Sequence, residues 1–67
     1  MDKQAIAAQI KSVAVNYEAM YDALDKKKAY EFGTDQHSRF SYEQAMHEEM
    51  LRDSLEALAG MGIEVDL

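Results

Sequence analysis

One apolar stripe near the start of the chain constrains the fold more than any other feature. Its six members recur at alternating steps of four and three residues, which places one of them on the same side of a helix at every turn. The members are Ile6, Ile10, Val13, Tyr17, Met20 and Leu24. A helix with such a stripe must bury it against another surface, so the pattern predicts packed helices.

A second amphipathic helix is predicted between Ser41 and Gly60. Wound as a helix, this stretch gathers its methionine and leucine residues on one half of the cylinder and most of its charges on the other. Ser41, with Gln44 three residues later, fits a capping box at the start of the helix. Gly60 fits the glycine that ends many helices.

The segment between the two elements can be interpreted in two ways. A helix end near Asp25 would leave about 16 residues of connection before Ser41, which is long for a small domain. Gly33 is a better terminator, so the preferred prediction is a first helix that starts after an Asp2 cap and runs almost to this glycine. A break near residue 25 is the alternative. The predicted elements are a helix over about 3–31, a loop over 33–41, a helix over about 42–59 and an extended tail over 60–67.

The size of the chain favours association with a second copy. Its 67 residues form a single domain over 1–67, and a domain this small buries only about 60% of its unfolded surface. Cysteine is absent, so no disulfide can add stability. We therefore predict an all-α fold, an antiparallel αα-hairpin that forms a homodimeric four-helix bundle. The residues expected at the self-association surface are Ile6, Ile10, Val13, Tyr17, Met20, Leu24, Met46, Met50, Leu55 and Leu58.

The first helix also carries a second band, made of small residues. The members of this band are Ala5, Ala8, Ser12, Val15, Ala19 and Ala23. Two interpretations are open. Alanine is the strongest helix former, which by itself explains the band. Alternatively, the band marks a close contact with a helix of another chain, because small side chains let two helix axes approach.

The charge balance restricts the choice of partner. Thirteen acidic residues against seven basic ones give a net charge of −6. A polyanion such as DNA would be repelled, so direct nucleic-acid binding is not expected, whereas a basic or nucleic-acid-binding protein would be attracted. The acidic ridge expected to face such a partner consists of Glu48, Glu49, Asp53 and Glu56. No apolar run approaches the ~20 residues of a membrane span and no signal peptide is recognised, so we predict a cytoplasmic protein without membrane contact.

Catalytic chemistry has little support in the sequence. There is no cysteine, no serine in the context of a nucleophile and no glycine-rich phosphate loop. Asp35, His37, Glu43 and His47 could be metal ligands, but their spacing matches no ligand signature. We therefore expect no enzyme activity, no metal and no cofactor. His47 is interpreted as an interface residue; if it is buried, assembly could respond to pH between about 5 and 7.

Aromatic residues cluster around the predicted loop, where Tyr30, Phe32, Phe40 and Tyr42 lie within thirteen residues. They could close the end of the hairpin as a small satellite cluster. They could instead form an exposed binding tip, because aromatic and arginine side chains are typical interface anchors. The candidate partner-binding residues are Tyr30, Phe32, Asp35, His37, Arg39, Phe40 and Tyr42.

These features together predict a small acidic helical module that binds other proteins and associates with itself. One alternative is an acidic inhibitor that mimics nucleic acid and so blocks a nucleic-acid-binding enzyme. A second alternative is a small metal-dependent enzyme.

Overall fold

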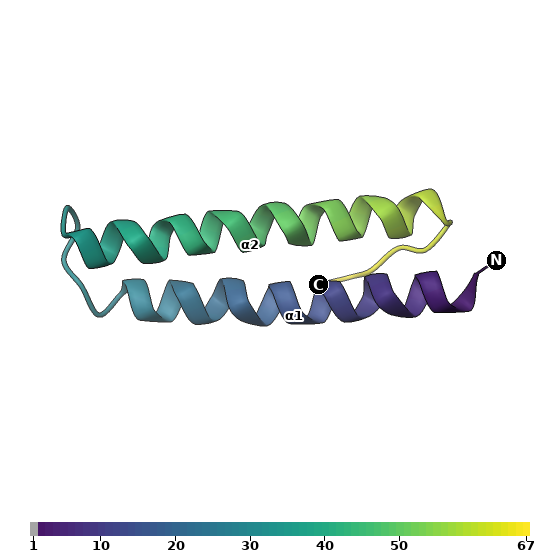
Figure 1. Ribbon diagram of the computed structural model, residues 1–67, viewed down its shortest axis with the longest axis horizontal. Coiled ribbons are helices and arrows are strands. Elements are labelled where there is room, and N and C mark those ends of the chain that lie inside the picture. The colour runs from purple at the N-terminus through teal and green to yellow at the C-terminus, as the bar shows by residue number, and fades with distance from the viewer. Residues whose placement is uncertain (1) are drawn as a thin grey trace.

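The chain folds into two antiparallel helices joined by a short loop (Figure 1). The computed structural model describes residues 2–67, and the Met1 end of the predicted domain lies outside them. Helix α1 covers Lys3–Lys27 and helix α2 covers Asp35–Gly60. The two helices pack along most of their length, and no strand occurs in the described part of the chain. The predicted αα-hairpin is therefore confirmed.

Helix α1 begins as predicted but ends earlier. The Asp2 side chain accepts hydrogen bonds from the backbone N–H groups of Gln4 (2.9 Å) and Ala5 (3.3 Å), which confirms Asp2 as the N-cap. The helix ends at Lys27, not near Glu31, so the preferred prediction of a helix to about residue 31 was wrong. The backbone tightens into turns there, with the N–H groups of residues 29 and 30 bonded three residues back.

Helix α2 begins seven residues before the predicted start at 42. Thr34 is its N-cap, because the Thr34 Oγ1 accepts a hydrogen bond from the His37 N–H at 3.2 Å. Gly33 precedes it with a φ of +92°, a conformation that glycine adopts readily. Ser41 consequently lies inside the helix, and the predicted capping box with Gln44 was wrong. The loop covers 28–34 instead of 33–41.

The end of α2 is closed by a Schellman motif in which Gly62, not Gly60, is the essential glycine. Gly60 is the last helical residue, whereas Gly62 has a φ of +81°. The Gly62 N–H bonds to the Ala59 carbonyl at 3.0 Å, and the Ile63 N–H bonds to the Leu58 carbonyl at 2.9 Å. The chain therefore leaves the helix abruptly and turns back along the hairpin.

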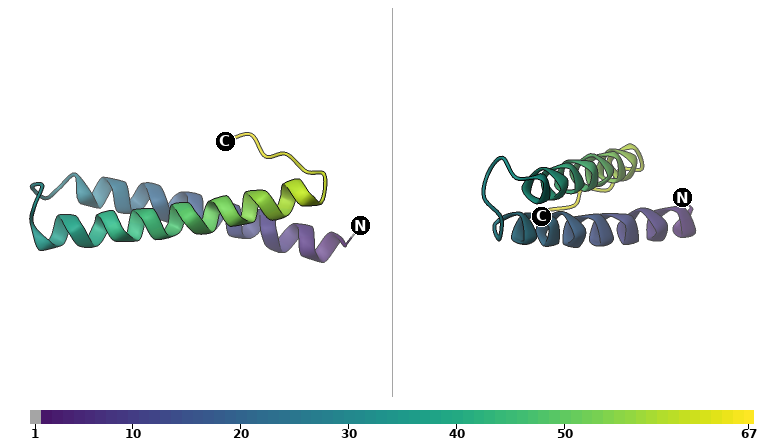
Figure 2. Two further views of the ribbon diagram at one scale, coloured as in Figure 1. Left: turned by 90° about the horizontal axis from the view of Figure 1, so that it is seen from above. Right: turned by 60° about the vertical axis from the view of Figure 1, so that its left-hand side comes forward.

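Helix α2 does not cover the apolar stripe of α1 directly. The buried residues of α1 are Val13 from the stripe, Ala23 from the small-residue band, and Asn16, which lies between the stripe and the band on the helix surface. The seam between the helices thus lies at the boundary of the two bands and buries one edge of each. Leu51 and Leu58 are the large residues that α2 contributes, and Leu58 is completely buried. The two helices cross at a shallow angle when seen from above (Figure 2).

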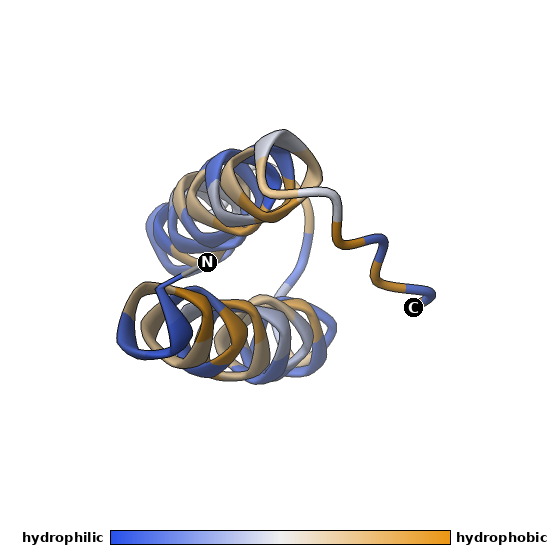
Figure 3. Ribbon diagram, turned by 90° about the vertical axis from the view of Figure 1, so that its right-hand side faces the viewer, coloured by the Kyte–Doolittle hydropathy of each residue, from blue (hydrophilic) through white to orange (hydrophobic). Residues whose placement is uncertain are grey.

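The tail over residues 61–67 runs back beside the hairpin without helix or strand (Figure 3). Met61, Ile63 and Val65 are partly buried and pack on the core formed by Val13, Leu51 and Leu58. The alternating Glu64 and Asp66 are exposed. Neither helix, over residues 2–67, has the length and apolar sequence that a bilayer crossing requires.

Candidate protein-binding surfaces

The hairpin leaves more large apolar residues in water than it buries. Among residues 2–67, the buried hydrophobic residues are Val13, Ala23, Leu51 and Leu58. The large hydrophobic residues that stay exposed are Ile10, Val15, Tyr21, Tyr30, Phe32, Tyr42, Met46, Met50 and Leu67. Two helices have only one seam between them, so the flanks of each helix keep exposed apolar residues. The tail covers part of one flank.

A line of polar residues runs along the centre of the seam. The Asn16 Nδ2 donates to the Ser12 carbonyl at 2.9 Å and lies 3.2 Å from the Ser12 Oγ. The Ser12 hydroxyl is 2.7 Å from the Ser54 hydroxyl, and the Asn16 Oδ1 is 3.0 Å from the His47 Nδ1. We call these four residues the polar seam. No side-chain nitrogen or oxygen that is buried in the described residues lacks a hydrogen-bond partner.

The polar seam gives His47 a structural role that the sequence analysis did not find. Because the Asn16 amide already donates to Ser12, its oxygen accepts and the His47 Nδ1 must donate. An Nδ1–H group is present in one neutral tautomer of histidine and in the imidazolium alike. The His47 side chain is partly buried.

One broad side of the hairpin is made of small residues and methionines. The seam residues mark the direction in which the helices face each other. On each helix, we consider the residues that lie about a quarter turn from the seam. In an antiparallel pair, those reached by the same sense of rotation on both helices lie on the same side of the pair. On this side lie Ala8, Val15 and Ala19 of α1 and Met46, Met50 and Ala57 of α2, which we call the alanine–methionine face. Val15 is 54% exposed and Met50 is 47% exposed.

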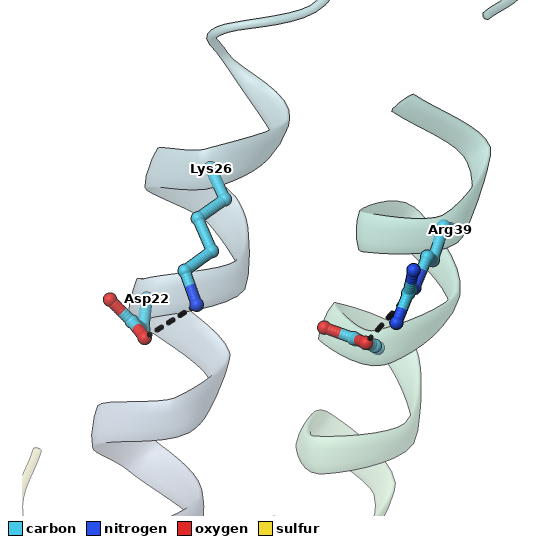
Figure 4. A network of polar contacts seen from close by, with 4 residues as sticks. Asp22, Lys26 and Arg39 are labelled. Carbon is cyan, nitrogen blue, oxygen red and sulfur yellow. Dashed lines mark ion pairs between the residues drawn. The ribbon is translucent and has the colours of Figure 1, made fainter. Parts of the chain in front are cut away.

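Two ion pairs border this face toward the loop. Lys26 lies 3.4 Å from Asp22 on α1, and Arg39 lies 3.8 Å from Glu43 on α2. Figure 4 shows the two pairs side by side on the neighbouring helices. Beyond them, α1 has a shallow hollow of about 360 Å³ lined by Val15, Glu18, Ala19 and Asp22.

The opposite side carries the outer part of the apolar stripe, and the tail lies over one end of it. Ile10, Tyr17, Tyr21 and Leu24 of α1, with Leu55 of α2, form this tail face. Figure 3 shows apolar residues of α1 on the same side as the tail. An open groove of about 560 Å³ lies between the tail and α2, with Leu55, Ala59, Ile63 and Val65 among its lining residues.

Two tyrosines meet on the tail face. The rings of Tyr17 and Tyr21 are 4.9 Å apart and tilted by 43°. Hydrogen bonding with Tyr21, the repulsion between two phenolates and partial desolvation together raise the pKa of Tyr17 above its ordinary value.

Two aromatic residues of the loop end stack on each other, and two others are largely exposed. Tyr30 and Phe40 stack with ring centres 5.8 Å apart, and the Lys26 ammonium lies 6.0 Å from the Phe40 ring. These contacts tie the loop to α2. Phe32, in contrast, is 92% exposed and Tyr42 is 70% exposed.

The remaining partner-binding candidates lie in the first turns of α2. The His37 ring meets the Phe32 ring edge-on at 5.4 Å, Asp35 opens the first turn of α2, and Arg39 pairs with Glu43. The loop end therefore has a stacked pair that closes the hairpin and two aromatic side chains that are exposed.

The acidic ridge is exposed throughout. Glu48, Glu49, Asp53 and Glu56 all lie in solvent, and Glu48 is 3.5 Å from Arg52. The four proposed metal ligands do not come together, because His47 lies in the seam and His37 at the loop. Within residues 2–67, no group of three or more His, Asp or Glu side chains is arranged to hold a metal ion.

No protein-family model, curated protein or solved structure matches this chain. The class of protein is therefore defined by the fold alone, as a two-helix αα-hairpin with exposed apolar flanks.

Proposed function

We propose that this chain is a small acidic helical module that acts by binding other proteins and that it associates with itself. The observation that carries the proposal is the excess of exposed surface. A compact monomer of 7.6 kDa exposes about 4,300 Å², whereas this chain exposes 5087 Å². The difference of about 800 Å² is the area that each partner contributes to a standard protein–protein interface.

The shape of the molecule supports the same conclusion. Its radius of gyration is 14.3 Å, against about 11 Å for a compact domain of this length. The extents are 47 × 17 × 14 Å, so the molecule is a short rod with two broad sides. Such a rod becomes a compact body only when another surface covers one of those sides, as in the four-helix bundle expected from the sequence.

Self-association is tested by sedimentation equilibrium over a wide range of chain concentrations. We expect a mass that rises to that of a dimer, together with a thermal midpoint that increases with concentration because association stabilises the folded state. A mass that stays at that of one chain up to millimolar concentration, with a midpoint independent of concentration, would contradict self-association.

Binding of a different protein is proposed at the loop end, because exposed Phe32, Tyr42 and Arg39 side chains resemble the aromatic and arginine anchors of known interfaces. The test is affinity capture with the wild-type chain, followed by binding measurements on each identified partner. We expect Phe32→Ala to weaken binding at least tenfold, whereas Leu67→Ala, which removes an exposed side chain of the tail, leaves it unchanged. Equal binding by the two variants would exclude the loop end.

The full exposure of the acidic ridge favours a second function, that of an acidic inhibitor of a nucleic-acid-binding protein. A variant that carries Glu48→Lys, Glu49→Lys, Asp53→Lys and Glu56→Lys should then lose binding to such a partner. Circular dichroism should show that its helices are intact. Unchanged binding by this charge-reversed chain would rule out the inhibitor.

A further inference from the structure

We propose that a second copy of this chain packs on the alanine–methionine face, with the two hairpins related by a two-fold axis parallel to the helices. This inference rests on the self-association proposed above and adds the face and the orientation. The loops then lie at the same end of the four-helix bundle, and Met46 of each copy fills the hollow on α1 of the other.

The face has the dimensions that a stable dimer needs. A broad side of the rod measures 47 × 17 Å, which is a footprint of about 800 Å². That footprint matches the excess surface of one chain. The tail lies on the other side, so the alanine–methionine face is the broad side that no segment of residues 2–67 covers.

The face is complementary to itself in size. Its α1 half carries small residues and a hollow whose floor is formed by Val15 and Ala19 between the acidic residues Glu18 and Asp22. Its α2 half carries the flexible side chains of Met46 and Met50. An axis parallel to the helices places α1 of one copy over α2 of the other, so that large side chains meet small ones. An axis perpendicular to the helices would place alanine against alanine and methionine against methionine, which leaves gaps beside the alanines.

The parallel axis also fixes the height at which residues meet, because a two-fold rotation about it produces no shift along the rod. The seam contacts show which residues of α1 and α2 lie at the same height. Ser12 contacts Ser54, and Asn16 contacts His47. By this register Met46 is level with Glu18 and Ala19, at the centre of the hollow. Met46 of the second copy therefore arrives at the hollow without any adjustment.

The face is tested with glutamate substitutions at residues that are similarly exposed but lie on opposite broad sides of the hairpin. Met46→Glu and Val15→Glu place a charge in the proposed contact, and Ile10→Glu places one on the tail face. We expect the first two to raise the dimer dissociation constant at least about 100-fold, because a buried unpaired charge is costly, and Ile10→Glu to change it less than about threefold. Circular dichroism must show that each chain remains helical.

The outcomes separate this inference from the proposed function. A wild-type chain that is monomeric at every concentration overturns self-association and this inference together. A wild-type dimer that Ile10→Glu disrupts and Met46→Glu does not leaves self-association standing and overturns the choice of face.

The orientation is tested by spin labels, since the chain has no cysteine of its own. Glu31→Cys places one label on the exposed loop of each copy. With the loops at the same end, the distance between labels is well below the 47 Å length of the rod. A distance near or beyond that length would show loops at opposite ends and overturn the parallel axis.

Discussion

Asn16 shows at the scale of a single residue how this hairpin selects one arrangement of its helices. It is 4% exposed, at the centre of the contact, where an apolar residue would add more hydrophobic stabilisation. Its amide nitrogen instead donates to Ser12 within α1, and its amide oxygen accepts from His47 of α2. The bond to His47 forms only when the two helices are at one height and one rotation. A buried polar residue that fixes register in this way is well known from coiled coils.

The bond between Asn16 and His47 should be measurable as an energetic coupling. Asn16→Ala leaves the groups of Ser12 and His47 short of a partner, and we expect a loss of about 1–3 kcal/mol in the free energy of unfolding. A double-mutant cycle with His47→Ala, measured by urea unfolding at fixed chain concentration, should give a coupling of about 0.5–3 kcal/mol. A cycle with exposed Gln36→Ala, on the order of 20 Å along the rod, serves as the control and should be additive. Additivity in both cycles would show that the bond does not contribute.

The pair of Tyr17 and Tyr21 predicts a stability change at alkaline pH. The raised pKa of Tyr17 means that the folded state holds the phenolic proton more tightly than the unfolded state does. This contribution to stability is fully present below the ordinary tyrosine pKa of about 10 and is lost as pH rises through the folded-state value. An absorbance titration should show Tyr17 ionising late, and Tyr21→Phe should return its pKa toward the ordinary value. An unchanged pKa of Tyr17 in that variant would contradict the assignment to Tyr21.

At the scale of helices, the sequence predicted the two elements but not where they meet. Periodicity was enough to predict two amphipathic helices, and the preference for aspartate at a helix start was enough for the Asp2 cap. The helix ends near the loop depend on a competition between caps. Thr34, placed directly after a glycine with positive φ, wins over Ser41, and the sequence contained this signal in Gly33 and Thr34. The position of the seam could not be predicted, since it depends on how Asn16 pairs with a residue of the other helix.

The end of α2 offers a matched pair of glycines. Gly62→Ala forces a side chain into a positive φ, and we expect it to lower the free energy of unfolding by about 1–2 kcal/mol. Gly60→Ala adds a methyl group to a helical residue with open space around it, and should be neutral or stabilising by up to about 1 kcal/mol. The free energy of unfolding of both variants, measured with urea, shows which glycine is needed to end the helix. A larger loss for Gly60→Ala would return the helix-ending role to that glycine.

At the scale of the whole molecule, charge opposes the association that the apolar surface favours. Two copies with a net charge of −6 each repel one another when they approach. Salt screens this repulsion, since the Debye length falls to about 10 Å at 0.1 M. We therefore expect the dimer dissociation constant to decrease as sodium chloride is raised, in sedimentation experiments at constant pH. Weaker association at high salt would instead indicate ion pairs between the copies, with Asp22, Lys26, Arg39 and Glu43 as the first residues to test.

The exposed aromatic residues at one tip of the rod have a consequence for how tightly a target can be held. A bundle with both loops at the same end presents two copies of Phe32 and Tyr42 close together. A target with two matching sites would bind both loop ends. The second contact would form at the high local concentration that the first contact creates. Weak individual contacts could then yield a long-lived complex, and dilution of the protein below its dimerisation range would release the target.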